Sequence, residues 1–228
     1  MALPAHRTGL PNVPGRLGRA ELAYVLGLRR RDPWADVTAQ EHAELVADES
    51  PRRAPGGRVG YSSMAVGLLG DALAHRAGLP YEALLRERVL DPLEMASTRV
   101  TVPPEESARL IAGHSRRGHV RPPIEDLMPA AGSLRSSADD MLRFLGACLH
   151  PPENELGRAL AFARGPGARV RGSMHVGLCW RVLRDRRGDR DVEHGAQRRR
   201  ARVRSRGCLV VKPRRGRRSC PRARGGRR

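Results

Sequence analysis

Apolar residues recur at helical spacing along several stretches of the chain, and segments rich in proline and glycine separate these stretches. The longest stretch runs from Met64 to Arg76 and is followed by Gly78 and Pro80, which are typical of a helix end. We predict a helix there. Its buried face is expected to comprise Met64, Ala65, Leu68, Leu69, Ala72 and Leu73.

Two shorter helices are predicted closer to the N-terminus. Residues 21–28 carry leucines and a valine near helical spacing, within a segment otherwise rich in Gly, Pro and Arg. Residues 36–48 are expected to form the second helix, since Thr38 can serve as the N-cap and Glu41 follows it by three residues. The loop at 50–60 then leads to the helix at 64–76.

Two further helices are predicted in the second half of the chain. One runs over about 81–89 and stops before Pro92, because a residue that precedes proline resists the helical region. The other starts at 136–140 and stops at the two prolines 151–152, with Asp139 and Asp140 expected to cap the helix rather than act as paired catalytic acids. Its predicted buried face comprises Met141, Leu142, Phe144, Leu145 and Cys148.

Strand patterns are few and lie mostly near the C-terminal end. Residues 98–128 show no strong period and are predicted to be irregular with short strands. Residues 176–183 are predicted to form one strand, 185–189 a turn, and 191–195 a second strand. This hairpin is the last ordered element that the pattern predicts.

Charge divides the chain into two parts. The formal net charge is +19, but residues 197–228 hold 15 of the 43 Lys and Arg residues and no Asp or Glu. Removing them leaves 28 basic and 24 acidic residues, a net charge of about +4 for 1–196. We therefore predict a domain over 1–196 and a disordered basic tail over 197–228.

The tail has two interpretations. A segment so rich in Arg, Gly and Pro is typical of a GC-rich coding region that is translated out of frame. We favour this interpretation, in which a frameshift produced residues 197–228. Alternatively, the tail is a basic arm that binds nucleic acid through phosphates, although it lacks the aromatic residues on which bases stack. Any nucleic-acid binding is expected only through 197–228.

Several other classes of protein find no support in the sequence. The four cysteines are widely spaced, and His114 and His119 have no acidic ligand in a helical frame, so neither a disulfide framework nor a metal site is predicted. The sequence has no long apolar run, and its N-terminus lacks a signal-peptide pattern. As written, the chain is expected to be cytoplasmic, with no membrane partner.

Five short motifs occur in order between residues 6 and 196. They are Thr8-Gly9-Leu10-Pro11; Pro55-Gly56 leading to Tyr61-Ser62-Ser63; Pro92-Leu93-Glu94-Met95 with Thr98; the segment from Ala130 to Asp140; and Gly177-Leu178-Cys179-Trp180 followed by His194-Gly195. In this order they resemble motifs of the serine beta-lactamases of class C and the related D-alanyl-D-alanine peptidases and esterases. A single match carries little weight, but five in sequence order point to this family.

The resemblance implies an α+β fold, in which helices cover an antiparallel sheet. It implies hydrolysis of beta-lactams, D-Ala-D-Ala peptides or small esters through an acyl-enzyme, without a cofactor. The substrate would be a small molecule or a peptide. Which of these substrates is used cannot be read from motifs that all members share.

The nucleophile of that family is the serine of a Ser-x-x-Lys pair, in which the lysine activates a hydroxyl that is otherwise too weak. The chain has one lysine, Lys212, and residue 209 is leucine, so the pair does not occur. In the family the pair lies upstream of the Thr-Gly-Leu-Pro turn and would here precede Met1. We therefore expect a fragment, with its sheet incomplete at both ends, that is inactive as written.

Four residues match functional positions of the family. Tyr61 stands at the position of the general base, with an ordinary tyrosine at a helix entrance as the alternative. Ser63 stands where the family carries a substrate-binding asparagine. His194 and Gly195 stand on the strand that meets the substrate carboxylate, and the alternative for His194 is a surface histidine at a strand end.

Overall fold

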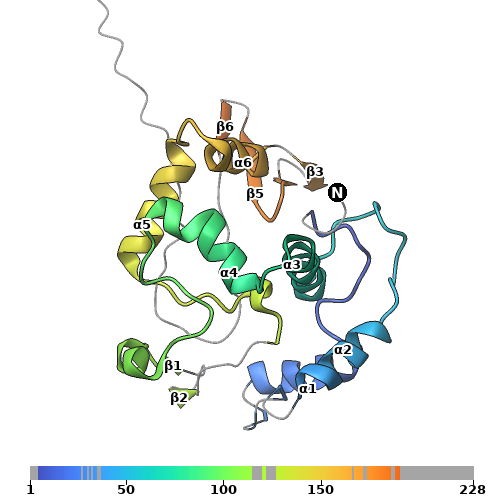
Figure 1. Ribbon diagram of the computed structural model, residues 1–228. Coiled ribbons are helices and arrows are strands. Elements are labelled where there is room, and N and C mark those ends of the chain that lie inside the picture. Colours follow the sequence, from blue (N-terminus) through green and yellow to red (C-terminus); the bar gives the residue numbers. More distant parts are fainter. Residues whose placement is uncertain are drawn as a thin grey trace, which may run out of the picture.

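The computed structural model describes most of the chain up to residue 190 (Figure 1). The described residues are 5–26, 28–29, 31, 33–34, 37–114, 120–121, 127–165, 167–171, 174–185 and 188–190. The basic segment 197–228 lies outside them, so the two-part division of the chain stays a prediction.

Six α-helices lie within the described residues: α1 (Gly15–Val25), α2 (Ala39–Ala47), α3 (Ser63–Ala77), α4 (Tyr81–Leu85), α5 (Ala138–Leu149) and α6 (Glu155–Ala163). Side chains cap four of them, because Thr38, Ser62, Ser137 and Asn154 each accept a hydrogen bond from a backbone N–H of the first turn. Thr38 and Glu41 form the predicted capping box. The helix α3 ends at Gly78 in the left-handed conformation, also as predicted.

Two antiparallel sheets accompany the helices. A two-stranded sheet joins β1 (Gly113–His114) to β2 (Val120–Arg121). A four-stranded sheet has the order β3 (Ala168–Arg171), β4 (Met174–Val176), β5 (Arg181–Asp185) and β6 (Gly188–Arg190), each strand pairing with the next along the chain. The fold class is α+β with antiparallel strands, which confirms the prediction.

The core around α3 depends on small residues. Met64, Ala65, Gly67 and Gly70 are the buried positions of this helix. A Cβ atom on Gly70 would overlap the Cβ of Ala130, in the 3-10 turn Pro129–Ala131, and would touch the ring of Tyr81. The helix therefore approaches that turn more closely than any larger residue would allow.

Three details of the prediction are wrong. The strand expected over 176–183 is broken between β4 and β5, where Cys179 has a positive φ of 62°. The second strand of the hairpin begins at Gly188 rather than 191. The first helix covers Gly15–Val25 rather than 21–28, and α6 and β3 were not predicted.

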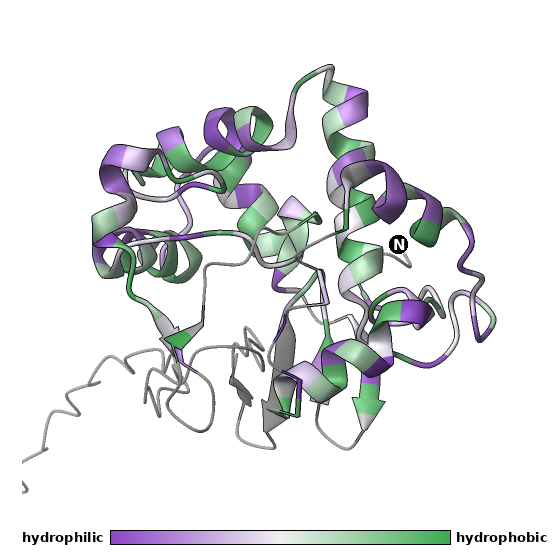
Figure 2. Cartoon of the chain, turned by 90° about the horizontal axis from the view of Figure 1, so that it is seen from below, coloured by the Kyte–Doolittle hydropathy of each residue, from purple (hydrophilic) through white to green (hydrophobic). Residues whose placement is uncertain are grey.

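The predicted buried faces also need correction. Leu73 on α3 is 48% exposed, and Met141 and Leu142 on α5 are 43% and 64% exposed. The helices carry hydrophobic and hydrophilic positions side by side, which Figure 2 shows. The spacing of apolar residues predicts the apolar face of a helix, but it does not predict which residues of that face pack against another element.

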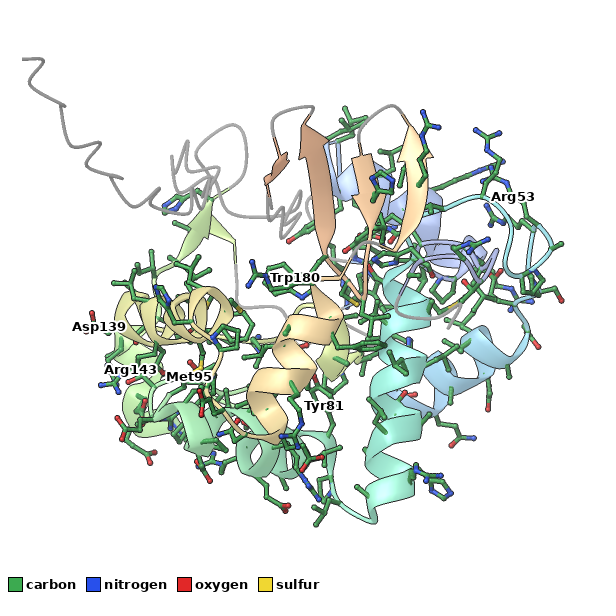
Figure 3. The ribbon with its side chains drawn as sticks, turned by 90° about the horizontal axis from the view of Figure 1, so that it is seen from above. Arg53, Tyr81, Met95, Asp139, Arg143 and Trp180 are labelled. Atoms are coloured by element: carbon green, nitrogen blue, oxygen red, sulfur yellow. The ribbon has the colours of Figure 1, made fainter. Side chains whose placement is uncertain are left out.

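Asp140 ties two distant segments together. It is buried, and its carboxylate accepts hydrogen bonds from the Ser97 amide at 2.9 Å and the Thr98 hydroxyl at 2.7 Å. Asp139 is exposed on the same helix, α5, whose Arg143 forms an ion pair with Glu94 at 2.7 Å (Figure 3). The prediction that Asp139 and Asp140 cap this helix is wrong, because the N-cap is Ser137, whose hydroxyl accepts a hydrogen bond from the Asp140 amide. Asp140 instead joins α5 to Ser97 and Thr98.

The contact between α3 and the Pro129–Ala131 turn can be tested with paired glycine substitutions. We expect Gly70→Ala to lower the free energy of unfolding by about 1–3 kcal/mol, because the added methyl overlaps Ala130. Gly146→Ala, on an exposed position of α5 where an added Cβ meets nothing within 4 Å, should instead stabilise by up to about 1 kcal/mol. Urea unfolding of both variants measures this, and equal effects would contradict the packing described.

Candidate functional site

Tyr61, Ser62 and Ser63 lead into α3 at its N-terminus. Ser62 is the N-cap, with an extended backbone (φ −143°) and a side chain that accepts a hydrogen bond from the Ala65 amide at 3.0 Å. Because the backbone is extended at this N-cap, consecutive side chains point to opposite sides: Ser62 is fully buried, whereas Tyr61 is 49% exposed. The tyrosine is thus available to a ligand, and the serine beside it is not.

Residues 6–12 lie against residues 52–64 and hold them by hydrogen bonds to the backbone. The Arg52 amide donates to the Gly9 carbonyl at 2.9 Å, and the Gly60 amide donates to the His6 carbonyl at 2.8 Å. The Gly56 amide donates to the carbonyl of Arg7 at 2.7 Å. We call this pairing the clamp.

The clamp requires a glycine at its centre. Gly9 has a positive φ of 77°, and a Cβ there would overlap the carbonyl oxygen of Arg53. Arg7 adds side-chain bonds, because its guanidinium donates to the carbonyls of Gly56 and Gly57. The Thr-Gly-Leu-Pro motif is therefore explained by close backbone approach.

Ser63 and Asn12 form a polar pair beside Tyr61. Both the amide and the hydroxyl of Ser63 donate to Asn12 Oδ1, each at 3.1 Å, and the Met64 amide donates to the Asn12 carbonyl at 3.0 Å. The Ser63 proton is thus directed to Asn12, which leaves the oxygen lone pairs to accept from a ligand. Asn12 was not among the predicted site residues, and no signal beyond its place after the turn indicated it.

His6 is a second residue that sequence reasoning did not select. Its ring is buried and lies 4.7 Å from the ring of Tyr61, with an angle of 34° between the planes. Its Nδ1 accepts a hydrogen bond from the Ser62 amide at 3.3 Å. The family's His-Thr-Ser-Gly-Leu-Pro pattern contained a signal for it, since His6 precedes Thr8 and Gly9.

Two predicted site residues, His194 and Gly195, lie outside the described residues, and their place in the site stays a prediction. The strand pair that precedes them, β5 and β6, is described up to Arg190. The part of the site that is described consists of Tyr61, Ser63 and the two supporting residues His6 and Asn12.

The serine hydroxyls of this region are engaged within the protein. The buried Ser62 hydroxyl donates to the Pro11 carbonyl at 2.7 Å while capping α3, and the Ser63 hydroxyl donates to Asn12. A serine nucleophile needs an adjacent base, and Lys212, the one lysine of the chain, lies outside the described residues. The described site can orient a phenol and accept or donate hydrogen bonds.

Tyr81 offers a useful contrast to Tyr61. Burial raises the pKa of Tyr81 above its ordinary value, and the nearby Cys179 adds to this effect. Its ring packs where Gly70 leaves space on α3. Tyr81 is therefore a packing residue, whereas Tyr61 presents about half of its surface to solvent.

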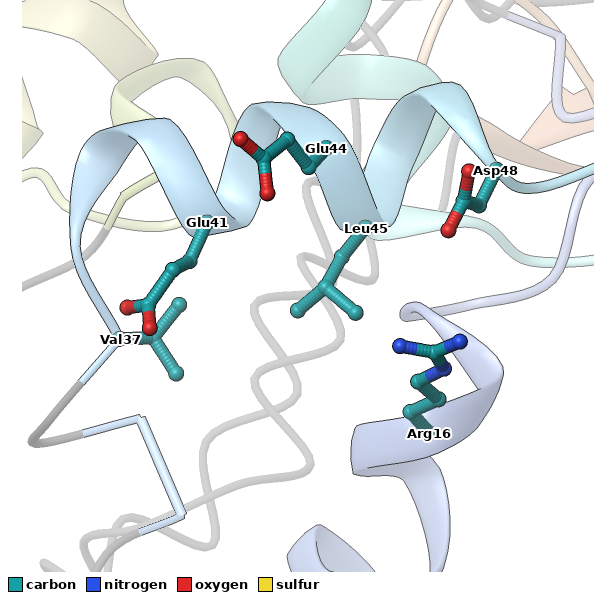
Figure 4. Close-up of a pocket in the computed structure, with 6 residues that line it drawn as sticks. All are labelled: Arg16, Val37, Glu41, Glu44, Leu45 and Asp48. Carbon is teal, nitrogen blue, oxygen red and sulfur yellow. The ribbon is translucent and has the colours of Figure 1, made fainter.

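A cavity of about 380 Å³ lies between α1 and the region of α2, apart from the predicted site residues (Figure 4). Its lining comprises Arg16, Val37, Glu41, Glu44, Leu45 and Asp48. Hydrogen bonds from the backbone and side chain of Thr38 lower the pKa of Glu41, which is thus committed to the capping box. None of the residues that line this cavity is a predicted catalytic or substrate-binding residue.

The described residues contain neither a metal-binding cluster nor a membrane-spanning helix. Among them, no three or more His, Cys, Asp or Glu side chains are grouped in a way that could hold a metal ion. None of the helices in the described ranges is both long enough and apolar enough to cross a bilayer.

Known proteins with similar sequences are beta-lactamases and a peptidase. D-alanyl-D-alanine-carboxypeptidase/endopeptidase AmpH of Escherichia coli K12 is 31% identical over 121 residues, which are 52% of this chain and 30% of that protein. A beta-lactamase of the same strain is 31% identical over 139 residues, or 58% of this chain and 36% of that protein. The chain thus spans about a third of the length of these relatives.

A solved class C beta-lactamase shares the fold, with a TM-score of 0.62 at 23% identity over 80% of this chain and 46% of that chain. The likeness at this identity concerns the fold alone. A family model described as Beta-lactamase matches residues 2–199 of the 228. Because that match covers most of the chain, the protein belongs to the Beta-lactamase family.

Proposed function

We propose that this chain carries the tyrosine part of a serine-hydrolase site that acts on beta-lactams, D-Ala-D-Ala peptides or small esters through an acyl-enzyme. The observation that carries the proposal is the Tyr61-Ser62-Ser63 segment, held by the clamp at the start of α3 with the tyrosine half exposed. In this proposal Tyr61 is the general base: a tyrosinate oxygen beside the reacting hydroxyl would take up its proton and become the neutral phenol.

Ser63 and Asn12 are proposed to bind the substrate. The family carries an asparagine where this chain has Ser63, and here a carboxamide lies beside Ser63 on the neighbouring residue Asn12. The Ser63 oxygen can accept a hydrogen bond from a substrate amide, since its own proton goes to Asn12. His194 and Gly195 are proposed to meet the substrate carboxylate, as their place in the motif order suggests.

The substrate class is proposed from the relatives. The names of two of them record beta-lactamase and D-alanyl-D-alanine-carboxypeptidase/endopeptidase activity. Both reactions transfer an acyl group to a serine in this family, so one site can serve either. No cofactor or metal is part of the proposed mechanism.

We further propose that the chain as written does not turn over such substrates. Acyl transfer needs a serine with a base beside it, and no Ser-x-x-Lys occurs in the 228 residues. The hydroxyls of Ser62 and Ser63 are committed to Pro11 and Asn12. Tyr61 can accept a proton or orient a substrate, but it cannot by itself form the acyl-enzyme bond.

Acylation by a fluorescent penicillin tests this proposal. We expect no covalently labelled band on a denaturing gel and no hydrolysis of a chromogenic cephalosporin, because the nucleophile is absent. Heat-denatured chain serves as the control for non-specific labelling. Labelling of the folded chain that excess unlabelled penicillin prevents would contradict the proposed inactivity.

The role of Tyr61 is tested in a chain joined to an upstream Ser-x-x-Lys segment from a member of the family. If this fusion is acylated, Tyr61→Phe should slow the acylation by roughly 10²- to 10⁴-fold, the usual contribution of a general base. Tyr81→Phe is the matched control, since it removes a hydroxyl but keeps the ring that packs on Gly70. Equal rates for Tyr61→Phe and the parent fusion would exclude the assigned role.

A second function is favoured by the charge of the tail alone. Residues 197–228 hold 15 basic residues and no acidic residue, which suits binding to nucleic-acid phosphates. This proposal needs no contribution from the described site. It predicts affinity without sequence preference, since contacts to phosphates carry no sequence information.

Titration with duplex DNA at several salt concentrations tests the tail. The logarithm of the affinity should fall linearly with the logarithm of the salt concentration, by about 0.9 for each phosphate contacted. A chain that ends at residue 196 should lose the binding. Binding that survives this deletion, or that ignores salt, would exclude the tail as a nucleic-acid arm.

A further inference from the structure

His6 holds the backbone on both sides of Tyr61 and also contacts the Tyr61 ring. The amide of Gly60, just before Tyr61, donates to the His6 carbonyl at 2.8 Å. The amide of Ser62, just after it, donates to His6 Nδ1 at 3.3 Å. The two rings lie 4.7 Å apart, so His6 meets the segment from Gly60 to Ser62 at three points, one of which is the Tyr61 ring.

The imidazole that makes these contacts is itself held in place. His6 is 9% exposed, and its backbone has a positive φ of 52°, a conformation that few residues other than glycine adopt. Its neighbour Arg7 is anchored by bonds to Gly56 and Gly57. A buried ring on a residue whose own carbonyl and whose neighbour Arg7 are both hydrogen-bonded has little freedom to swing away from Tyr61.

The hydrogen bond from Ser62 also defines the chemical form of the ring. A nitrogen that accepts a hydrogen bond carries no proton, so His6 bonds Ser62 with a deprotonated Nδ1. The proton of the neutral imidazole then lies on Nε2. A residue of the same size without an acceptor at this atom would leave the Ser62 amide unpaired inside the protein.

We propose that His6 is the positioning residue for Tyr61: its ring fixes the direction of the phenol, and its Nδ1 and carbonyl fix the backbone on each side. This inference rests on the proposed function of Tyr61, because a general base must meet the reacting hydroxyl at hydrogen-bond distance. Half of the Tyr61 surface is open to solvent, so contacts on the buried side are what restrain its orientation.

Three substitutions of His6 separate its two contributions. His6→Asn keeps an acceptor near the position of Nδ1, and asparagine tolerates a positive φ, but the variant has no ring. His6→Phe keeps a ring and has no acceptor. His6→Ala has neither. The matched control is His75→Asn, at an exposed position in the last turn of α3.

NMR spectra of the full chain provide the measurement, with the Tyr61 ring signals identified through Tyr61→Phe. In the wild type we expect nuclear Overhauser contacts between the His6 and Tyr61 rings. We expect His6→Ala and His6→Asn to shift the Tyr61 ring signals while those of Tyr81 stay in place. Exchange of the Ser62 amide should be roughly fivefold to tenfold faster in His6→Ala and His6→Phe, and His6→Asn should restore slow exchange.

The inference is overturned if the wild type shows no contact between the two rings, or if folded His6→Ala leaves both the Tyr61 signals and the Ser62 exchange unchanged. If His6→Ala does not fold, the wild-type spectra and the opposite effects of His6→Asn and His6→Phe decide. Failure of the proposed function of Tyr61 is read separately, from the acylation rates of the Tyr61→Phe and parent fusions, which do not depend on these spectra.

Discussion

The hydrogen-bonded clamp between residues 6–12 and 52–64 is the interaction on which the site depends. The loop before Tyr61 is rich in Pro, Gly and Arg, and such a loop has no structure of its own to place a side chain. The clamp supplies it with backbone partners: the amides of Arg52, Gly56 and Gly60 all donate to carbonyls of the segment from His6 to Gly9. Without these bonds, α3 would keep its cap but Tyr61 would have no defined direction.

Close packing of small residues fixes the other side of α3. Gly67 and Gly70 let the helix approach Met128 and Ala130, and Tyr81 fills the space that remains. The clamp therefore acts at the N-terminus of a helix whose position is already determined by contacts further along it. A rigid helix with a restrained entrance is a suitable support for a catalytic side chain, because small displacements are costly in a close-packed interior.

Local signals in the sequence predicted much of the fold. The capping box at Thr38 and the end of α3 at Gly78 were correct, because caps are decided by residues within one turn. Which apolar residues would be buried was predicted less well: Leu142 is exposed, whereas Gly70 is buried, because burial depends on distant partners such as Ala130. The break in the strand at Cys179 likewise reflects a backbone conformation that no residue pattern announced.

The sequence predicted only part of the candidate site, because several of the family motifs specify the fold and not the chemistry. Gly9 permits close backbone approach, and Thr98 binds the buried Asp140, so these two motif positions specify the fold rather than the chemistry. Motifs that specify the fold do not require the nucleophile, and this chain matches the family model although its 228 residues contain no Ser-x-x-Lys. Tyr61 could be selected by its motif. His6 and Asn12 stand next to a motif, but their roles could not be inferred from it, because these roles arise from contacts across more than fifty residues of sequence. A residue with a positive φ and a buried ring, such as His6, keeps an unfavourable conformation only where its surroundings offset the cost, and here the hydrogen bonds from Gly60 and Ser62 connect it to the segment that carries Tyr61.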